Sequence, residues 1–290
     1  MKNEKREIGK LIIVRGGGDL ATGTIHKLWS AGFFVVVLET QYPAAIRRQV
    51  SLCEAVYGGE TSVEDMTGVL AFDEDGIFSV LEEGKVPVVV DPEGKFIAKW
   101  KPEVVVDGIL AKRNLGTYKK MAPLTIALGP GFCAGKDVDV VIETKRGHNL
   151  GRVIREGEAY PNTGIPGNIG GYTSERVIHS EKRGILKNKK NIGDIVKKGE
   201  VIAVIEGEGE ETEETPVRAT IDGILRGLIR DGFPVTEGFK IADIDPRKEE
   251  LENCFTISDK ARCIGGSVLE VVCRYFLEKS KDKAALEMVE

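Results

Sequence analysis

The chain has 290 residues and a hydrophobic fraction of 41%, which is enough for one large domain or two ordinary domains with a substantial core. Its net charge of −5, with both signs mixed, provides no basic stripe for phosphate neutralisation, so we expect no nucleic-acid partner. The charged N-terminal stretch precedes an apolar run too short for a signal peptide or a membrane span, which predicts a cytoplasmic protein without a membrane partner.

The clearest motif follows a first predicted strand over residues 11–14. Its candidate cofactor-binding residues are Gly16, Gly17, Gly18, Asp19, Ala21, Thr22 and Gly23. A strand that turns this tightly into a helix directs backbone N–H groups at a phosphate, where the helix dipole also favours an anion. The spacing Gly16-x-Gly18-x-x-Ala21 therefore predicts a dinucleotide-binding loop.

A second apolar strand over residues 33–38 ends at Glu39, about 20 residues past the glycines, where dinucleotide sites hold a ribose-binding carboxylate. Arg47 and Arg48 follow and can instead bind a 2′-phosphate, so the choice between NAD and NADP stays open. Asp19 would repel a pyrophosphate unless it caps the helix, and the capping interpretation is the favoured one.

The remaining apolar runs of the first half are 86–90, 104–106, 124–128 and 138–142, and helices are expected at 20–31 and 74–83. This alternation predicts a Rossmann-like, doubly wound parallel sheet over residues 1–145. Ligands of such sheets lie beyond the carboxyl ends of the strands. Asp107 and Asn114 are therefore candidate cofactor ligands, and Lys112 is a candidate phosphate ligand or proton donor.

Four further candidates lie after later strands. Arg146 and Arg152 suit anion recognition, and His148 between them can carry a proton, although an interdomain hinge with solvated charges explains the segment equally well. Cys133 lies in a glycine-rich turn whose backbone amides can lower the pKa of a thiol, although cysteines in such turns are usually packing residues.

With three histidines and no H-x-x-x-H pattern, we expect no metal site. The five cysteines show no C-x-x-C pair, so we expect reduced thiols without disulfides.

Residues 146–252 change to short runs separated by Gly, Pro, Asn and Thr, which predicts a β-rich domain. Within residues 190–246, the pattern V-x-x-G-x-x-I-A-x-I occurs at 196–205 and again at 235–244. The pattern is similar to the hammerhead of biotinyl and lipoyl carrier domains, but residues 206–215 lack the acceptor lysine, so we read it as a structural or docking unit. Residues 253–290 are expected to form a helix that packs back on the first domain, interrupted at Gly265-Gly266.

Taken together, the segments resemble the YqeB-type accessory proteins of selenium-dependent molybdenum hydroxylase systems. The matching stretches are 15–23, 45–50, 107–117, 129–152, 161–171 and 242–247. The resemblance implies a cytoplasmic maturation role for a molybdenum hydroxylase of the xanthine dehydrogenase type. It implies no established reaction, so whether the protein is an enzyme stays open.

Three hypotheses follow. The leading one is an accessory protein that holds a nucleotide-tailed cofactor, such as molybdopterin dinucleotide, NAD(P) or FAD, at the glycine loop. The second is an NAD(P)-dependent oxidoreductase with Lys112 or His148 as proton donor. The third is a non-catalytic assembly module that docks on a hydroxylase. Strand edges in the β-rich half lead us to expect a homo-oligomer.

Overall fold

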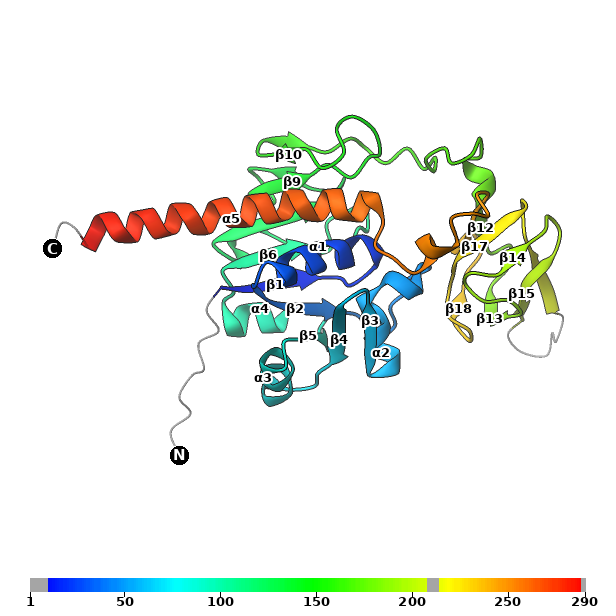
Figure 1. The fold of residues 1–290 in the computed structure, drawn as a ribbon, viewed down its shortest axis with the longest axis horizontal. Helices are drawn as coiled ribbons and strands as arrows, with labels where there is room; N and C mark the ends of the chain where they lie inside the picture. The colour runs from blue at the N-terminus through cyan, green and yellow to red at the C-terminus, as the bar shows by residue number, and fades with distance from the viewer. Residues whose placement is uncertain (1–9, 208–213, 288–290) are drawn as a thin grey trace.

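The computed structural model describes residues 10–207 and 214–287, with side chains described as far as residue 282. An α/β part and a smaller β part lie next to each other, and a long C-terminal helix runs along the α/β part (Figure 1). Residues 208–213, which belong to the segment that lacks an acceptor lysine, lie outside the described residues.

A nine-stranded sheet forms the α/β part, in the order β10-β9-β7-β6-β1-β2-β5-β4-β3. These strands are β1 (Leu11–Arg15), β2 (Phe34–Glu39), β3 (Glu60–Val63), β4 (Met66–Leu70), β5 (Val86–Val90), β6 (Val104–Asp107), β7 (Leu124–Leu128), β9 (Val140–Ile142) and β10 (Val153–Ile154). All neighbours are parallel except the edge pairs β3–β4 and β9–β10. The central strands are buried on both faces because helices cover each side.

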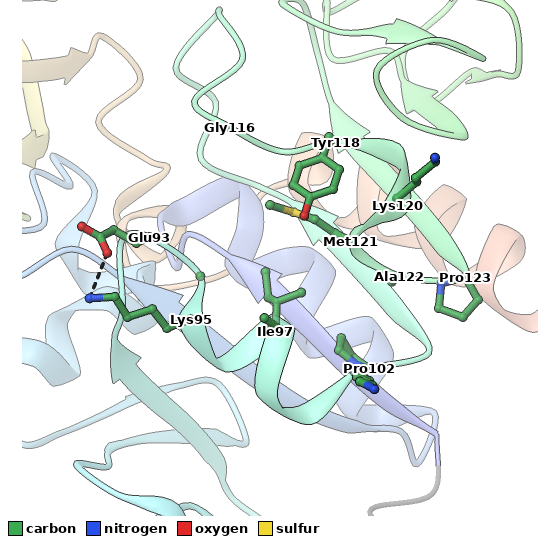
Figure 2. A pocket seen from close by; sticks show the side chains of 13 residues that line it. Glu93, Lys95, Ile97, Pro102, Gly116, Tyr118, Lys120, Met121, Ala122 and Pro123 are labelled. Atoms are coloured by element: carbon green, nitrogen blue, oxygen red, sulfur yellow. Dashed lines mark ion pairs between the residues drawn. The ribbon is translucent and has the colours of Figure 1, made fainter.

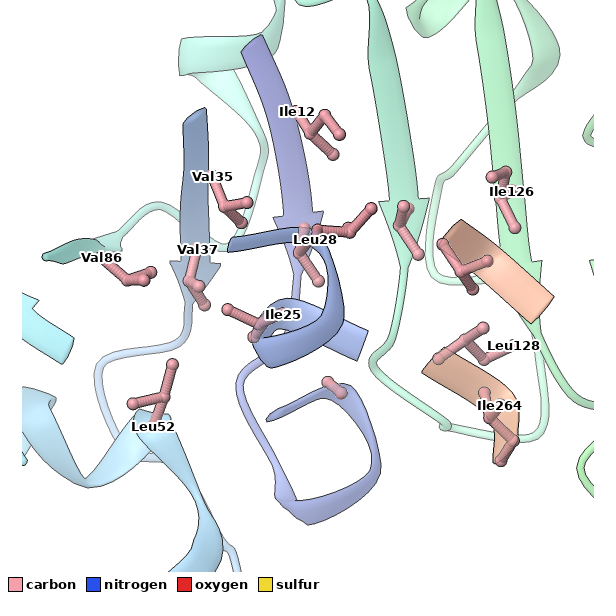
Figure 3. Close-up of a cluster of buried hydrophobic side chains, with 14 of the residues drawn as sticks. Ile12, Ile25, Leu28, Val35, Val37, Leu52, Val86, Ile126, Leu128 and Ile264 are labelled. Carbon is pink, nitrogen blue, oxygen red and sulfur yellow. The ribbon is translucent and has the colours of Figure 1, made fainter. Parts of the chain in front are cut away.

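Two helical layers cover the sheet. The helices are α1 (Asp19–Ser30), α2 (Ala55–Gly58), α3 (Glu74–Glu82), α4 (Lys95–Trp100) and α5 (Asp259–Glu287). Alternate strand residues such as Ile12 and Val37 pack with Ile25 of α1 and Ile264 of α5 (Figure 3). The residues between them, such as Ile13, pack with α3 and α4. α1 and α3 confirm the two helices expected in this half.

The predicted Rossmann-like, doubly wound parallel sheet is wrong. The sheet is mixed, and the connection from β6 to β7 holds only the 3₁₀ turn η3 (Lys119–Met121) instead of a covering helix. A hairpin over residues 60–70 also adds an antiparallel edge that the sequence interpretation left out. The reason is physical: short apolar runs read alike whether their neighbours are parallel or antiparallel.

The β part consists of two four-stranded antiparallel sheets, β12-β19-β17-β14 and β16-β15-β13-β18. Its strands are β12 (Val177–His179), β13 (Gly184–Asn188), β14 (Ile195–Val196), β15 (Val201–Glu206), β16 (Glu214–Arg218), β17 (Gly223–Leu228), β18 (Pro234–Val235) and β19 (Lys240–Asp245). A separate antiparallel pair consists of β8 (Cys133–Ala134), which precedes β9 in the chain, and β11 (Gly157–Glu158), which follows β10. The remaining 3₁₀ turns are η1 (Arg48–Val50), η2 (Leu52–Glu54), η4 (Ser174–Arg176) and η5 (Leu251–Cys254).

The predicted biotinyl or lipoyl hammerhead is wrong as a description of this part, which is a pair of facing antiparallel sheets. The repeated sequence pattern produces β14 with β15 and β18 with β19, and each pair turns at a glycine with positive φ: 86° at Gly199 and 75° at Gly238. Glycine adopts a positive φ without steric strain, so it is common at this position of strand–turn–strand units of many folds. The pattern therefore specifies two turns and does not specify a carrier fold.

α5 runs without a break through Gly265 and Gly266, so the expected interruption is wrong. A Cβ at Gly265 would lie 2.5 Å from the Gly23 carbonyl oxygen, and a Cβ at Gly23 would lie 2.6 Å from Cβ of Ala261. The glycines therefore let α1 and α5 approach closely, and do not break the helix. In the part of the chain that the structure describes, no helix is both long and apolar enough to cross a bilayer.

Candidate functional site

α1 begins without a side-chain cap. Its N-cap residue is Gly18, in extended conformation. Gly18 has no side chain that could accept a hydrogen bond from the N–H groups of the first turn. A Cβ added to Gly18 would meet no described atom within 4 Å, so open space adjoins the helix start. The capping interpretation of Asp19 is wrong: Asp19 is the first helical residue, and its Oδ2 lies 3.7 Å from Nη1 of Arg47.

The other loop residues are surrounded by protein. Gly16 has a φ of 92°, and a Cβ there would lie 3.0 Å from the Ile109 backbone. A Cβ at Gly17 would lie 3.0 Å from the Cys53 nitrogen. Internal packing thus explains two of the three glycines, and Gly18 alone among them faces open space.

Glu39 lies against the glycine loop. Its Oε1 accepts the Gly17 N–H at 2.5 Å and its Oε2 accepts the Thr40 N–H at 2.9 Å. Burial raises the pKa of the Glu39 carboxyl, and these two backbone hydrogen bonds partly oppose the rise. The structure therefore shows a carboxylate that holds the loop in position, while its expected bond to a ribose stays a prediction.

Residues 46–54 connect the glycine loop to the β part. The Cys53 N–H donates to the Gly17 carbonyl at 2.9 Å, and the Leu52 N–H donates to Thr22 Oγ1 at 3.0 Å. Arg47 donates to the Asn253 carbonyl at 2.8 Å, and Arg48 donates to the Leu228 carbonyl at 2.8 Å. Arg47 therefore lies at the start of α1, whereas Arg48 is held by a strand of the β part.

Basic side chains from distant segments gather near the start of α1. Arg146 pairs with Asp259, the first residue of α5, at 2.7 Å and 3.1 Å. This contact holds the pKa of Asp259 at about 2. Arg226 of β17 and Lys260 of α5 complete the group. Gly227, next to Arg226, packs against Ile46, next to Arg47, and Ala261, next to Lys260, packs against Gly23 of α1.

Arg226 and Lys260 were missed by sequence reasoning. Arg226 interrupts an apolar run on β17, and a charged residue in such a run is a signal that the sequence does contain. In the structure its side chain is only 13% exposed, and a buried charge of this kind needs a polar or charged partner. Lys260 carries no comparable local signal. Both reach Asp19 and Arg47 only through the tertiary fold.

The loop after β6 is held by internal bonds. Asp107 accepts from Thr117 Oγ1 at 2.5 Å, and Asn114 bonds the backbone of Gly116 and Thr117. Burial raises the pKa of Asp107. Lys112, with a φ of 61°, is exposed on the same loop. The observed contacts of Asp107 and Asn114 are thus structural.

The remaining candidates do not gather at the glycine loop. Cys133 lies on the pair β8–β11, where its N–H donates to Asp137 at 2.9 Å. His148 and Arg152 are exposed on the segment that follows β9. The buried carboxylate at the end of β9 is that of Glu143, which accepts hydrogen bonds from the N–H groups of Lys145 at 2.6 Å and Tyr160 at 2.8 Å.

One cluster of metal-ligating atoms does form among the described residues, although the sequence predicts none. His26 Nε2 lies 2.7 Å from Asp65 Oδ1 and 3.9 Å from Glu64 Oε2. The other Glu64 oxygen accepts from Arg262 at 2.6 Å and from the Ile257 N–H at 2.8 Å. These ion pairs already account for the arrangement.

A surface pocket of about 820 Å³ lies between α4 and residues 116–123 (Figure 2). Ile97, Tyr118 and Met121 line it, and Glu93 pairs with Lys95 at its rim at 2.9 Å. It contains none of the predicted site residues.

The fold and site define a mixed α/β protein with an antiparallel β part, whose uncapped helix start is bordered by basic side chains from both parts. No family model matches the chain. It is 50% identical over 264 residues to the Uncharacterized protein YqeB of Escherichia coli K12, a match that covers 91% of this chain and 47% of that protein. The chain thus spans about half the length of the curated relative it matches.

Two solved structures show weak likeness. An aspartoacylase family protein from Mesorhizobium loti has a TM-score of 0.29 at 14% identity, covering 81% of this chain and 84% of that one. The Ectoine utilization protein EutE (DoeB) from Ruegeria pomeroyi has a TM-score of 0.27 at 11% identity, covering 80% and 85%. At such TM-scores the likeness supports no statement about the fold or the activity of this chain.

Proposed function

We propose that the chain binds a nucleotide-tailed cofactor at the start of α1, with the cofactor's phosphates on the first-turn N–H groups. The observation that carries this proposal is the uncapped helix start at Gly18, which adjoins open space. An uncapped N-terminus leaves backbone donors without partners, and the helix dipole favours an anion there. Arg47 beside Asp19 offsets the repulsion that this carboxylate would exert on a phosphate.

The biological role that we propose is maturation of a selenium-dependent molybdenum hydroxylase of the xanthine dehydrogenase type. The identity to YqeB over 91% of this chain supports the YqeB-type resemblance on which this role is based. The relative itself bears the name Uncharacterized protein YqeB. The resemblance favours molybdopterin dinucleotide among the possible cofactors and the cytoplasm as the location. Among the described residues, His148 forms no hydrogen bond or ion pair with the glycine loop, so this residue gives the oxidoreductase alternative no support.

Gly18→Val tests the cofactor site. The branched side chain would occupy the space beside the first-turn N–H groups, so we expect dinucleotide affinity to fall at least about tenfold. Native mass spectrometry of the full chain with molybdopterin, nicotinamide and flavin dinucleotides identifies the ligand, and equilibrium dialysis measures the affinities. Gly58→Val is the matched control, because Gly58 lies on α2 and also adjoins open space.

Binding that survives Gly18→Val unchanged would show that the phosphates lie elsewhere. If the unmodified chain binds none of the three dinucleotides, a docking module without a cofactor replaces this proposal.

A further inference from the structure

We infer that the proposed cofactor site is composite: Arg226 of the β part and Lys260 of α5 join Arg47 in binding a diphosphate group that bridges the two parts of the chain. This inference rests on the proposed function and names the charge class of its ligand. Three cations from three segments surround one helix start, and each lacks a full complement of partners.

Arg47 is the first of these cations. Its side chain is 10% exposed, and its Nε has no hydrogen-bond partner among the described residues. One terminal nitrogen donates to the Asn253 carbonyl at 2.8 Å, and the other lies 3.7 Å from Asp19, beyond hydrogen-bond distance. A buried donor without an acceptor costs free energy, which a bound anion would recover.

Arg226 of β17 is a second arginine with a buried, unpartnered Nε among the described residues. Its side chain is 13% exposed, its Nε is also unpartnered within the described chain, and the Asp245 oxygen paired with it is 4.0 Å away. Asp245 already accepts from Arg247 at 2.8 Å and 3.0 Å. Burial lowers the pKa of Arg47, and the charge of Arg226 lowers it further. The two guanidinium groups therefore repel each other where a bridging anion would attract both.

Lys260 supplies the third charge. It is half-buried one residue into α5, and it forms no ion pair within 4.0 Å in the described part of the chain. Burial lowers the pKa of Lys260, and Asp19 acts against that change. Ala261, the residue after Lys260, packs so closely on α1 that a Cβ at Gly23 would lie 2.6 Å from its Cβ. Lys260 thus lies near the α1 start, and an anion bound there would balance its positive charge.

The nearby carboxylates are already engaged by other arginines. Asp259 is paired with Arg146, Asp245 with Arg247, and Asp243 with Arg176 at 3.0 Å. Asp19 and Glu143 are the remaining carboxylates whose charge acts on Lys260, and the hydrogen bonds that Glu143 accepts come from backbone N–H groups. Arg47, Arg226 and Lys260 together thus carry at least one positive charge more than these two carboxylates balance, and an anion such as a diphosphate would supply the missing negative charge whereas a neutral ligand would not. Guanidinium forks are also suited to phosphate oxygens.

The test uses the full chain and inorganic pyrophosphate as probe, with inorganic phosphate for comparison, in isothermal titration calorimetry. We expect pyrophosphate to bind more tightly than phosphate. Arg226→Gln should weaken pyrophosphate binding at least tenfold, and Arg226→Lys should recover part of the loss because it keeps the charge without the fork. Arg218→Gln is the matched control, since Arg218 lies exposed on β16 of the same part. Thermal unfolding of each variant verifies that it folds.

The outcomes separate the two proposals. Weakening by both Gly18→Val and Arg226→Gln supports the composite site. Dinucleotide and pyrophosphate binding that responds to Gly18→Val but not to Arg226→Gln overturns the composite site and leaves the proposed function standing. Pyrophosphate binding that responds only to Arg226→Gln supports the arginine site and removes the glycine loop from it. A wild-type chain that binds no pyrophosphate overturns this inference, whatever the dinucleotide result.

Discussion

Asp259 shows how a single contact ties a residue of the C-terminal helix to the segment after β9. Its carboxylate accepts two hydrogen bonds from Arg146 and another from the Lys260 N–H at 2.7 Å. The Arg146 hydrogen bond is the main reason that the pKa of Asp259 is about 2, below its ordinary value of 3.8. The ionised form is thus favoured in the folded chain.

A lowered carboxyl pKa stabilises the fold above the pKa of the unfolded chain, and this contribution is lost as the pH falls from about 4 to about 2. Arg146→Gln should therefore reduce the free energy of unfolding at pH 7. The reduction should be below about 1 kcal/mol, because the Asp259 side chain is 73% exposed and water screens the pair. Chemical unfolding between pH 2 and 7 measures the difference, which should shrink toward pH 2. A difference that stays constant over this range would contradict the assignment.

At the scale of elements, the packing of α1 on α5 depends on glycines that face the other helix. Both helices begin at the side of the sheet next to the β part, which brings Asp19 and Lys260 together (Figure 1). Gly23 and Gly265 permit this approach, whereas a Cβ on neighbouring Gly266 would meet nothing described within 4 Å. Adjacent glycines in one helix therefore have different roles.

Gly265→Ala and Gly266→Ala form a matched pair. The first substitution forces a Cβ against the Gly23 backbone, and we expect it to lower the free energy of unfolding by about 1–3 kcal/mol. The second adds only helix propensity, and we expect a change between zero and a gain of about 1 kcal/mol. Urea unfolding of the two variants measures both. Equal effects would show that the close contact between the helices is not maintained in solution.

At the scale of the whole molecule, residues 46–57 hold the α/β part and the β part together. The Leu228 N–H donates to the Ile46 carbonyl at 2.9 Å, and Arg230 pairs with Glu54 while lying 4.2 Å from the ring centre of Tyr57. Glu54 is buried, and burial raises the pKa of its carboxyl against the opposing effect of Arg230. The contact between the α/β part and the β part at residues 46–57, here called the joint, is thus partly polar and includes the ion pair of Arg230 with Glu54.

Arg230→Met tests the joint. It would leave the Glu54 carboxylate buried without its main partner, and we expect a loss of about 1–3 kcal/mol in the free energy of unfolding. Urea unfolding measures the loss, with the exposed Arg274→Gln on α5 as a control that should change it by less than about 0.5 kcal/mol. A loss no larger than that of the control would mean that the joint does not rely on this pair.

Sequence reasoning succeeded where contacts are local. The strand, glycine turn and helix over residues 11–30 follow from apolar spacing and from the positive φ at Gly16, and Glu39 reaches the loop because parallel neighbours β1 and β2 end at the same edge. The same reasoning assigned a cap to Asp19 and a break to Gly265, since neither the first-turn geometry nor the partner helix is visible in the sequence.

The amino-acid sequence by itself determined the central buried strands, the helices α1 and α3 and the two repeated glycine turns, because φ preferences and apolar periodicity act over a few residues. Only the tertiary structure decided the mixed direction of the sheet edges, the pairing of two β sheets, and the meeting of Arg47, Arg226 and Lys260. The last of these features joins segments about 200 residues apart, and all three depend on burial and charge, which exist only once the chain has folded.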